Sequence, residues 1–455
     1  MTWLNRTHFG DCRESMRRMI AAGVRVNCVV TSPPYWGLRD YGVPPLVWGG
    51  RADCNHAWGP ELRRHKGGPH GNGVMLSGGR AVVDAQSKTK DIVSGNFCQH
   101  CDAWRGALGL EPDLRMYVTH MVEVFALAWQ LLADDGVLWL NLGDSYAGST
   151  GGLPEKNLCM IPARVAIALQ EWGWYLRQEI IWSKPNPMPE SVTDRCTKAH
   201  EQIFLLTKRP KYFFDSEAIA EPAGYAHEAI YDNGLNGHGG GVSHAGQGSS
   251  TRKFKSGNKT RKPGSARGCP EGTGAHVCGS VPWEGITRNK RSVWTVTTKP
   301  FKGAHFATFP PDLIEPCILA GTSAHGHCYK CGAGWERITE KGAPNLDHQR
   351  ACGGDANGKY RGKAIKEYAG TGAQDASATK ARILEGMRPT ITVGWQPTCD
   401  CGVVADKGIV FDPFGGSGTT AQVAQEFGRH WILCELNPDY ESLQQERTRQ
   451  IGMAL

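Results

Sequence analysis

The stretch 408–435, GIVFDPFGGSGTTAQVAQEFGRHWILCE, reads as a strand, a glycine-rich turn, a helix and a second strand. Small residues that let the backbone come close to a ligand form the turn and the start of the helix: Gly415, Gly416, Ser417, Gly418, Thr419 and Thr420. The first N–H groups of such a helix attract an anion. Glu435 ends the second strand about 20 residues later, where a carboxylate can accept hydrogen bonds from ribose hydroxyls. This unit predicts an α/β fold that binds a nucleoside.

The residues that open the turn narrow the choice of ligand. The stretch lacks the GxGxxG spacing of dinucleotide-binding turns and begins instead with Asp412, Pro413 and Phe414. A carboxylate at position 412 could face a cationic amine of the ligand, which favours a nucleoside carrying an amino acid over a dinucleotide. A plain loop is the alternative, because a glycine-rich turn by itself is a weak signal.

The rest of the chain alternates short apolar runs with amphipathic stretches, as in a Rossmann-like α/β sheet. Helical spacing of apolar residues predicts helices at Leu114–Leu132 and Ile161–Trp172. Six segments are predicted strands: Val26–Val30, Val137–Leu142, Gln178–Trp182, Gln202–Leu206, Gly408–Phe411 and His430–Glu435.

The first predicted strand runs straight into residues 31–36, TSPPYW. Active sites of open α/β sheets lie at such carboxyl ends of strands. Pro33 and Pro34 lack N–H donors and fix φ, so the carbonyls of Ser32 and Pro33 keep one rigid geometry. The Ser32 hydroxyl and the Pro33 carbonyl could then accept the two hydrogens of an amino group.

Such acceptors suit methylation of a nucleobase amine, which is a poor nucleophile because its lone pair is delocalised into the ring. Two acceptors would draw the nitrogen toward tetrahedral geometry and aim its lone pair at a sulfonium methyl. Tyr35 could stack on the base after the base leaves the duplex. The alternative is a rigid turn with a packing aromatic residue.

The pair TSPPYW and FDPFGGSGTT resembles the DNA amino-methyltransferases that modify cytosine N4 or adenine N6. The catalytic tetrapeptide precedes the cofactor turn, as in the circularly permuted beta group of that family. The resemblance implies a Rossmann-like fold with a mixed seven-stranded sheet, S-adenosylmethionine as cofactor, and double-stranded DNA as substrate. It extends to FGDC at residues 9–12, which implies that Asp11 contacts the cofactor adenine. HFATFPPDLIEPCI from His305 resembles the helix that closes over the cofactor.

The resemblance favours cytosine N4 as the target, because Ser before Pro-Pro-Tyr is found mostly in cytosine-N4 enzymes. Adenine N6 stays open, since a hydroxyl and a carboxylate can both accept an amine hydrogen. Carbon methylation is not expected, because it needs a cysteine nucleophile beside the base and Cys28 lies inside the predicted strand. An inactive zinc-containing DNA-binding protein and an RNA or protein methyltransferase are the rival functions.

Sixteen cysteines, several in close pairs, predict metal sites rather than disulfides. One predicted structural zinc site comprises two such pairs, Cys328, Cys331, Cys399 and Cys401. FCQHCDAW from Phe97 is similar to HCYKCGAGW from His327, which suggests a second site. Its predicted ligands are Cys54, His56, Cys98 and Cys101, with His100 or His120 as alternatives to His56. Ordinary reduced cysteines are the competing interpretation for both sets.

The formal charge of +7 has the sign expected of a protein that meets DNA. Six basic side chains in one glycine- and serine-rich run are candidates for phosphate contact: Arg252, Lys253, Lys255, Lys259, Arg261 and Lys262. A solvated basic run is the alternative. The chain has no long apolar run and no signal-peptide pattern at Met1–Gly10, which predicts a cytoplasmic protein, and the resemblance implies a bacterial or phage origin.

Three polar stretches rich in glycine and proline divide the chain and predict its domain organisation. The methyltransferase core is expected in three pieces, at 1–48 with the catalytic turn, at 111–215, and at 403–455 with the cofactor turn. Four segments separate them: a zinc insertion at 49–110, a flexible basic target-recognition region at 216–295, the cofactor-closing helix at 296–326, and a second zinc insertion at 327–402.

Overall fold

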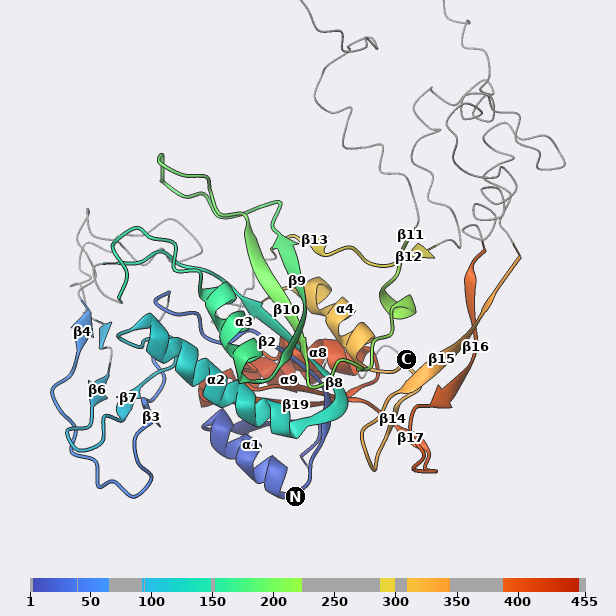
Figure 1. Ribbon diagram of the computed structural model, residues 1–455, viewed down its shortest axis with the longest axis horizontal. Coiled ribbons are helices and arrows are strands. Elements are labelled where there is room, and N and C mark those ends of the chain that lie inside the picture. The colour runs from blue at the N-terminus through green and yellow to red at the C-terminus, as the bar shows by residue number, and fades with distance from the viewer. Residues whose placement is uncertain are drawn as a thin grey trace, which may run out of the picture. The chain divides into compact units, whose positions relative to one another are not determined.

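A mixed sheet of eight strands organises the larger part of the computed structural model (Figure 1). The structure describes residues 3–38, 40–64, 92–93, 95–148, 152–222, 287–298, 309–343 and 388–449. The chain divides into two units, of which the first comprises Met1–Ile219, Lys290–Ile338 and Gly394–Leu455 and holds the whole sheet. The second unit comprises Ala220–Asn289 and Thr339–Val393.

The strands of this sheet follow the order β1-β19-β18-β2-β8-β10-β9-β13. All run in one direction except β10, which is antiparallel to both of its neighbours. Their bounds are Arg6–Phe9 (β1), His430–Glu435 (β19), Ile409–Asp412 (β18), Val26–Thr31 (β2), Leu132–Leu142 (β8), His200–Thr207 (β10), Tyr175–Ser183 (β9) and Val293–Thr295 (β13). The mixed α/β sheet is therefore confirmed, with eight strands instead of the predicted seven.

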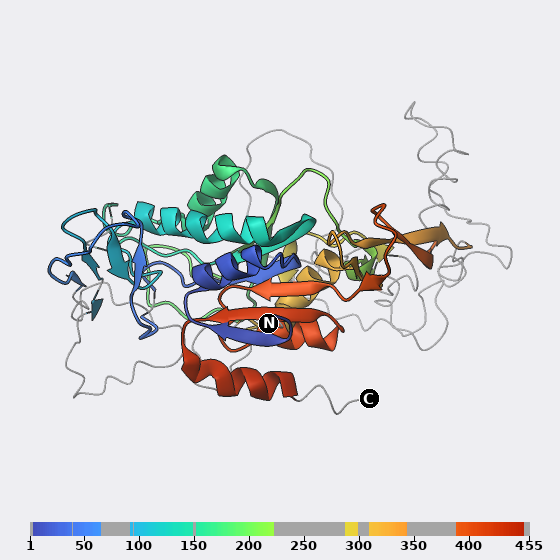
Figure 2. The ribbon, with the colours of Figure 1, turned by 90° about the horizontal axis from the view of Figure 1, so that it is seen from below.

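Helices cover both faces of the sheet and give it three layers. One face carries α1 (Cys12–Ala21), α2 (Leu114–Leu131) and α3 (Ile161–Trp172), and α2 packs against the other two. The opposite face carries α4 (Pro311–Gly321) and α8 (Thr419–Glu426). A further helix, α9 (Glu441–Arg449), packs against α8, and Figure 2 shows the strands between α2 and α9.

Alternation of side chains along the strands creates the two cores between these layers. In β8, Leu138, Leu140 and Leu142 join the core beneath α1, α2 and α3. Val137 and Trp139 of the same strand join the core beneath α4 and α8. Strands that are buried on both faces have nearly continuous apolar sequences, which is why the central strands could be predicted from the sequence.

Smaller sheets form the insertions. β3 (Leu46–Trp48), just before the first predicted insertion, makes a three-stranded sheet with β7 (Trp104–Gly106) and β6 (Asn96–Phe97) of the insertion, and β4 (Arg63–Arg64) pairs with β5 (Ile92–Val93). Further along, β14 (His327–Cys328) pairs with β17 (Ala405–Asp406), and β15 (Trp335–Lys341) pairs with β16 (Thr390–Pro397). Short 3-10 turns occur at Glu217–Ile219 (η1) and Pro438–Tyr440 (η3).

The described part of the second unit is small. It contains β11 (Glu221–Pro222), which pairs antiparallel with β12 (Thr287–Arg288). Most of the predicted target-recognition region and residues 299–308 of the predicted cofactor-closing segment lie outside the described residues. Among the helices that the structure describes, none is long and apolar enough to cross a membrane.

Candidate active site

The predicted catalytic and cofactor-binding residues meet where the parallel strands finish, which we call the carboxyl end of the sheet. Asp11 follows β1, residues 32–35 follow β2, Asp412 ends β18 and Glu435 ends β19. We call the glycine-rich turn at 412–418 the cofactor turn and residues 32–35 the catalytic turn, after their predicted roles. Because β18 lies directly between β19 and β2, these two turns are neighbours in space although they lie near opposite ends of the sequence. Open α/β sheets bind their ligands at such an end.

The glycine-rich turn is held in place by Glu435. Its carboxylate accepts hydrogen bonds from the N–H of Gly416 at 2.7 Å and from the N–H of Asn437 at 2.8 Å. Gly418 precedes α8 with φ of +83°, a conformation that residues other than glycine rarely adopt. A Cβ on Gly415 would lie 2.9 Å from the Cβ of Leu433, so the turn also needs glycine where it crosses β19. The sequence thus builds a backbone cradle at the start of a helix.

Asp412 ties the cofactor turn to the catalytic strand. Its Oδ1 accepts hydrogen bonds from the Thr31 hydroxyl at 2.6 Å and from the Phe414 N–H at 2.9 Å, while its Oδ2 accepts one from the Thr420 hydroxyl at 2.8 Å. The residue is 2% exposed. Burial raises the pKa of Asp412 to about 6, although these hydrogen bonds favour the ionised form. Asp412 therefore positions the turn as well as bringing a carboxylate to it.

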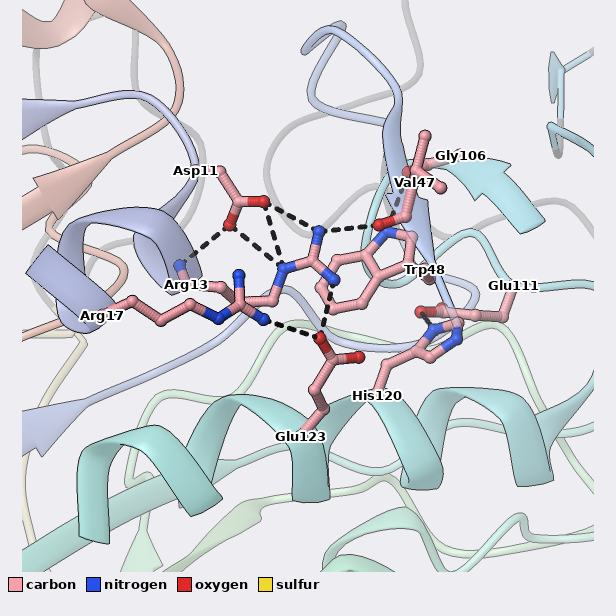
Figure 3. Close-up of polar contacts among 9 residues, drawn as sticks. All are labelled: Asp11, Arg13, Arg17, Val47, Trp48, Gly106, Glu111, His120 and Glu123. Atoms are coloured by element: carbon pink, nitrogen blue, oxygen red, sulfur yellow. Dashed lines mark hydrogen bonds and ion pairs between the residues drawn. The ribbon is translucent and has the colours of Figure 1, made fainter. Parts of the chain in front are cut away.

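In the structure, the Asp11 carboxylate pairs with Arg13 (Figure 3). It caps α1 by accepting a hydrogen bond from the Arg13 N–H at 2.8 Å, and it forms a bidentate ion pair with the Arg13 guanidinium. That guanidinium also pairs with Glu123 at 3.0 Å and lies 3.7 Å from the ring centroid of Trp48. The charge of the Asp11 carboxylate is therefore already balanced by Arg13, which also contacts β3.

The catalytic turn has hydrogen-bonding partners on or beside three other strands. The Ser32 hydroxyl donates to the Tyr35 hydroxyl at 3.0 Å, and the Tyr35 hydroxyl donates to Oε2 of Glu201 at 2.8 Å. Asn141 on β8 donates to the Tyr35 oxygen at 2.9 Å and to Glu201 Oε2 at 3.1 Å. Lys184, just after β9, forms a short ion pair with Oε1 of Glu201. We call these five residues the Ser32–Glu201 network.

The charges in this network follow from burial and pairing. Burial alone would raise the pKa of Glu201, but the Lys184 ammonium and the hydrogen bonds from Lys184, Tyr35 and Asn141 outweigh it, so the net pKa is lowered. Burial and the charge of Glu201 hold the pKa of Tyr35 well above its ordinary value. Nearby, Lys198 donates to the Asp144 carbonyl at 2.9 Å, and burial lowers its pKa. The network therefore contains an ionised carboxylate and a neutral phenol.

The two prolines and the Tyr35 ring are fixed by close packing. The Pro34 carbonyl accepts a hydrogen bond from the Tyr117 hydroxyl at 2.9 Å, and Pro33 is buried. A Cβ on Gly143 would lie 2.5 Å from Cε2 of Tyr35, so only glycine leaves room for the ring there. The turn is held firmly, and its aromatic ring has one packed face.

Sequence reasoning missed the polar residues around this turn: Asn141, Lys184 and Glu201 in the network, and Lys198 near it. Two of them carry a signal that could have been used. Asn141 interrupts the apolar run VLWLNL, and Glu201 stands just before the apolar run of β10. A polar residue inside or beside a buried strand needs a partner, and the partner in an open sheet lies at the same end.

The structure brings both predicted sets of metal ligands together. In each set one donor atom per residue lies within 4.8 Å of all the others: Cys54, His56, Cys98 and Cys101 in the first insertion, and Cys328, Cys331, Cys399 and Cys401 in the second. The Sγ atoms of Cys54 and Cys98 are 3.9 Å apart, and Cys101 Sγ is 3.4 Å from His56 Nδ1. Zn–S bonds of ~2.3 Å in a tetrahedron place sulfur atoms ~3.8 Å apart, so the spacing fits zinc.

The histidine alternatives at the first set are separated by their contacts. His120 lies between the rings of Trp48 and Trp104, with its Nδ1 2.9 Å from the Glu111 carboxylate. His100 contributes its backbone N–H, which donates to Cys98 Sγ at 3.3 Å. His56 is the histidine whose ring nitrogen lies among the sulfur atoms. The set that the structure assembles is therefore the first of the predicted alternatives.

The remaining predicted residues cannot all be placed. The basic run comprising Arg252, Lys253, Lys255, Lys259, Arg261 and Lys262 lies outside the described residues. α4, from the segment predicted to close over the cofactor, packs against β2, β8 and α8 and buries Leu313, Ile314 and Ile318. Its described contacts make it part of the layer that covers the sheet, and its closing role stays a prediction.

Comparison with known proteins agrees with this site. The profile of the DNA methylase family of N6 and N4 methyltransferases matches residues 26–328 and 401–446. The Type II methyltransferase M.Cfr9I of Citrobacter freundii is 33% identical over 335 residues, which cover 69% of this chain and 71% of that protein. The Type II methyltransferase M.SmaI of Serratia marcescens is 27% identical over 460 residues, which cover 96% of this chain and 88% of that protein.

Among solved structures, PvuII DNA methyltransferase (cytosine-N4-specific) aligns over 98% of this chain and 89% of that chain, with 12% identity and a TM-score of 0.41. The family profile covers well over half of this sequence, including the catalytic turn and the cofactor turn. This chain belongs to the DNA methylase family, whose members transfer a methyl group from S-adenosylmethionine to the exocyclic amino nitrogen of cytosine or adenine in DNA.

Proposed function

We propose that this methyltransferase modifies N4 of cytosine in double-stranded DNA, after the target base has left the duplex. The observation that carries the proposal is the Ser32 hydroxyl in a firmly held Ser-Pro-Pro-Tyr turn at the carboxyl end of β2, beside the cofactor turn of β18. A hydroxyl that donates its hydrogen to Tyr35 keeps lone pairs for an incoming amine. Adenine N6 is the alternative target.

The chain's own residues would bind, orient and activate the amine. S-adenosylmethionine supplies an electrophilic methyl group on sulfur. The Ser32 hydroxyl and the Pro33 carbonyl would each accept one amine hydrogen, which draws the nitrogen out of conjugation and aims its lone pair at that methyl. Tyr35 would stack on the base with the face of its ring that is opposite Gly143. Attack by the amine needs orientation and electrostatics and no activated water.

The residues around the glycine-rich turn fit S-adenosylmethionine by the chemistry of their donors and acceptors. The cradle of Gly415, Gly416, Ser417 and Gly418, with Thr419 and Thr420 opening α8, would approach the amino-acid part of the cofactor. Glu435 has oxygen lone pairs left to accept from ribose hydroxyls, and Phe414 would border the pocket. Asp412 would attract the cofactor's ammonium group, and Asp11 would contact its adenine.

We further propose that the two sulfur-rich sets each hold a structural zinc ion. Both consist of four donors in two close pairs, which leaves no open coordination position and no role in catalysis. The first set would anchor the short strands β6 and β7, and the second would anchor β14 to the segment before β17. The basic run from Arg252 to Lys262 would contact DNA phosphates.

Nucleoside analysis tests the proposed function directly. Purified protein is incubated with labelled S-adenosylmethionine and PCR-amplified genomic fragments, which carry no methylated cytosine or adenine and contain every short recognition sequence. Label is expected in 4-methylcytosine. Label in 6-methyladenine would mean that adenine N6 is the target and that the proposed mechanism still holds. Label in 5-methylcytosine would overturn the mechanism. Ser32→Ala should slow the reaction by at least about tenfold without weakening cofactor binding.

A further inference from the structure

Methylation of an amine leaves a proton that must go somewhere. The N–CH₃ bond forms as the C–S bond breaks, the sulfur keeps the electron pair, and the nitrogen becomes positively charged until it loses one hydrogen as a proton. A serine hydroxyl can accept a hydrogen bond from that nitrogen, but it cannot hold the proton, because a protonated alcohol is a very strong acid. The proposed function therefore lacks a final proton acceptor.

The Ser32–Glu201 network supplies a connected path away from Ser32. The path has two steps, 3.0 Å from Ser32 Oγ to Tyr35 Oη and 2.8 Å from Tyr35 Oη to Glu201 Oε2. Ser32 Oγ is the donor in the first step and Tyr35 Oη is the donor in the second. Each hydroxyl can therefore pass on its own hydrogen as it receives another. The path ends on a carboxylate, the one base among these five residues that can accept a proton.

We propose that Glu201 is the acceptor of the proton released from the methylated amine, and that Ser32 and Tyr35 relay the proton to it. The inference rests on the proposed function, in which Ser32 contacts the target amine. The amine hydrogen moves to Ser32 Oγ, the Ser32 hydrogen moves to Tyr35 Oη, and the Tyr35 hydrogen moves to Glu201 Oε2. The positive charge of the methylated nitrogen is thereby cancelled by the carboxylate, and both hydroxyls are regenerated.

The surroundings of Glu201 keep it ionised and ready before the reaction. Lys184 neutralises Oε1, while Oε2 accepts from both Tyr35 and Asn141. The other charged groups that act on this region are Lys198, Asp144 and Glu190. A carboxylate with a lowered pKa is still a far stronger base than a methylated exocyclic amine, whose positive form is destabilised by loss of ring conjugation. The transfer therefore runs downhill.

The sheet explains why this acceptor comes from a distant segment. β10 is antiparallel to β8, so it begins at the end where the parallel strands finish. Glu201, its second residue, therefore reaches the catalytic turn from across β8. Asn141, on β8 between them, fills the gap by donating to both Tyr35 and Glu201.

Single-turnover kinetics across pH tests the relay. The protein is saturated with labelled S-adenosylmethionine at each pH, and labelled 4-methylcytosine and 6-methyladenine are counted in PCR-amplified genomic fragments. Wild-type protein should show a rate that is nearly constant from about pH 6 to 9, because Glu201 stays ionised throughout. Glu201→Gln should be slower by on the order of a hundredfold at pH 7, and its rate should rise with pH, because the proton must then leave to water or hydroxide.

Two further variants make the result specific. Tyr35→Phe removes the middle hydroxyl and keeps the ring, so it should acquire the same rising pH profile, and the Glu201→Gln/Tyr35→Phe double variant should be no slower than the worse single variant. Glu179→Gln makes the same substitution at an exposed position of β9 and should behave like the wild type. Calorimetry of cofactor binding checks that each variant is folded.

The outcomes separate the relay from the function on which it rests. A slow Glu201→Gln rate that does not depend on pH would mean a structural role and would overturn the relay. A wild-type rate in Glu201→Gln would overturn the relay as well. If Glu201→Gln does not fold, the Tyr35→Phe variant gives the answer: a rate that rises with pH supports the relay, and a rate that does not depend on pH overturns it. Label in 6-methyladenine would mean that the target is adenine. The pH profiles of the variants would then test the relay for that base in the same way. Wild-type protein that labels neither amino-methylated base would overturn both the relay and the proposed function.

Discussion

Asp412 has a structural role and, in the proposed function, a binding role, and we expect the two to respond to pH in opposite directions. Burial raises its pKa to about 6, above the ordinary value near 4. The ionised carboxylate therefore carries a cost to folding that is present above pH 6 and disappears as the pH falls below about 4. Binding of a cationic ammonium requires the ionised form. We expect the affinity for S-adenosylmethionine to fall by up to about tenfold between pH 7 and pH 5.

Calorimetric titrations over this pH range check the prediction. Asp412→Asn should bind the cofactor more weakly at pH 7 and should lose most of the pH dependence. Because burial also raises the pKa of Glu435, this variant shows how much of the dependence belongs to Asp412. Asp406→Asn, at an exposed carboxylate before β18, is the matched control. An unchanged pH dependence in Asp412→Asn would contradict the assignment.

Arg13 and Arg17 both pair with Glu123, and they offer a direct comparison of buried and exposed ion pairs (Figure 3). The Arg13 side chain is 6% exposed and also balances Asp11, whereas the Arg17 side chain is 56% exposed. Arg13→Ala leaves the largely buried Asp11 carboxylate without its ion-pair partner, while Glu123 keeps Arg17, and should lower the free energy of unfolding by about 3 kcal/mol. Arg17→Ala should cost less than about 1 kcal/mol.

Chemical denaturation of the two arginine variants measures the difference. Equal losses of stability would show that the Arg13 pair is no stronger than a surface pair. Calorimetry of cofactor binding adds a second readout. The affinity of Arg13→Ala for S-adenosylmethionine should not fall, because Asp11 keeps its carboxylate and loses a competing partner.

Residues whose chemistry depends on their own neighbours in the sequence were predictable. Ser32 and the prolines after it define a turn by themselves, and Glu435 follows its glycine turn at a characteristic distance. Glu201 was not predictable in this way, because its position depends on the antiparallel direction of β10, which no local pattern specifies. His56 was one of three alternatives, and only its place among the sulfur atoms separates it from the other two.

The strands that carry or directly precede proposed zinc ligands are too short to hold their shape by hydrogen bonds alone, which gives the proposed zinc ions a structural task. β6 and β14 each contain two residues. Elemental analysis should find two zinc ions per chain, and Cys98→Ser and Cys328→Ser should each remove one and lower the thermal stability. Cys196→Ser, at an exposed cysteine outside both sets, should leave zinc and stability unchanged. Protein that contains no zinc when prepared without chelators would contradict both sites.

Elements buried in the core were easier to predict than elements at the edges. The six predicted strands all occur, but the edge strands β1 and β13 were not among them. Their sequences, RTHF and VWT, are short and show no continuous apolar run, because an edge strand packs less of its surface. β8 starts at Leu132 rather than at Val137, since residues 134–136 look like a helix stop but continue the strand.

The positive charge of the protein should govern its binding to DNA. If the basic run contacts phosphates, replacing Lys253 and Lys255 with Gln should weaken binding at all sequences and reduce the slope of log affinity against log salt by up to about two. Arg25→Gln/Lys407→Gln serves as the control. It removes two exposed charges where β2 and β18 begin, which is the end of the sheet away from the candidate active site. Fluorescence anisotropy with a labelled duplex at several salt concentrations measures the slope for each double variant. Equal slopes for the two would show that the basic run does not contact DNA phosphates.

The strand order has a consequence for synthesis on the ribosome. β2 is made early but pairs with β18, and β1 pairs with β19, so two early strands wait for partners that emerge several hundred positions later, as the registers of Val410 with Cys28 and of Arg6 with Ile432 show. Until then β1 lacks its partner and β2 is paired only on the side of β8, so their remaining hydrogen-bonding edges are open to other chains. Chains interrupted before β18 should therefore aggregate or be degraded and never persist as partly active enzyme, so a cell that makes this protein acquires methylation only from completed molecules.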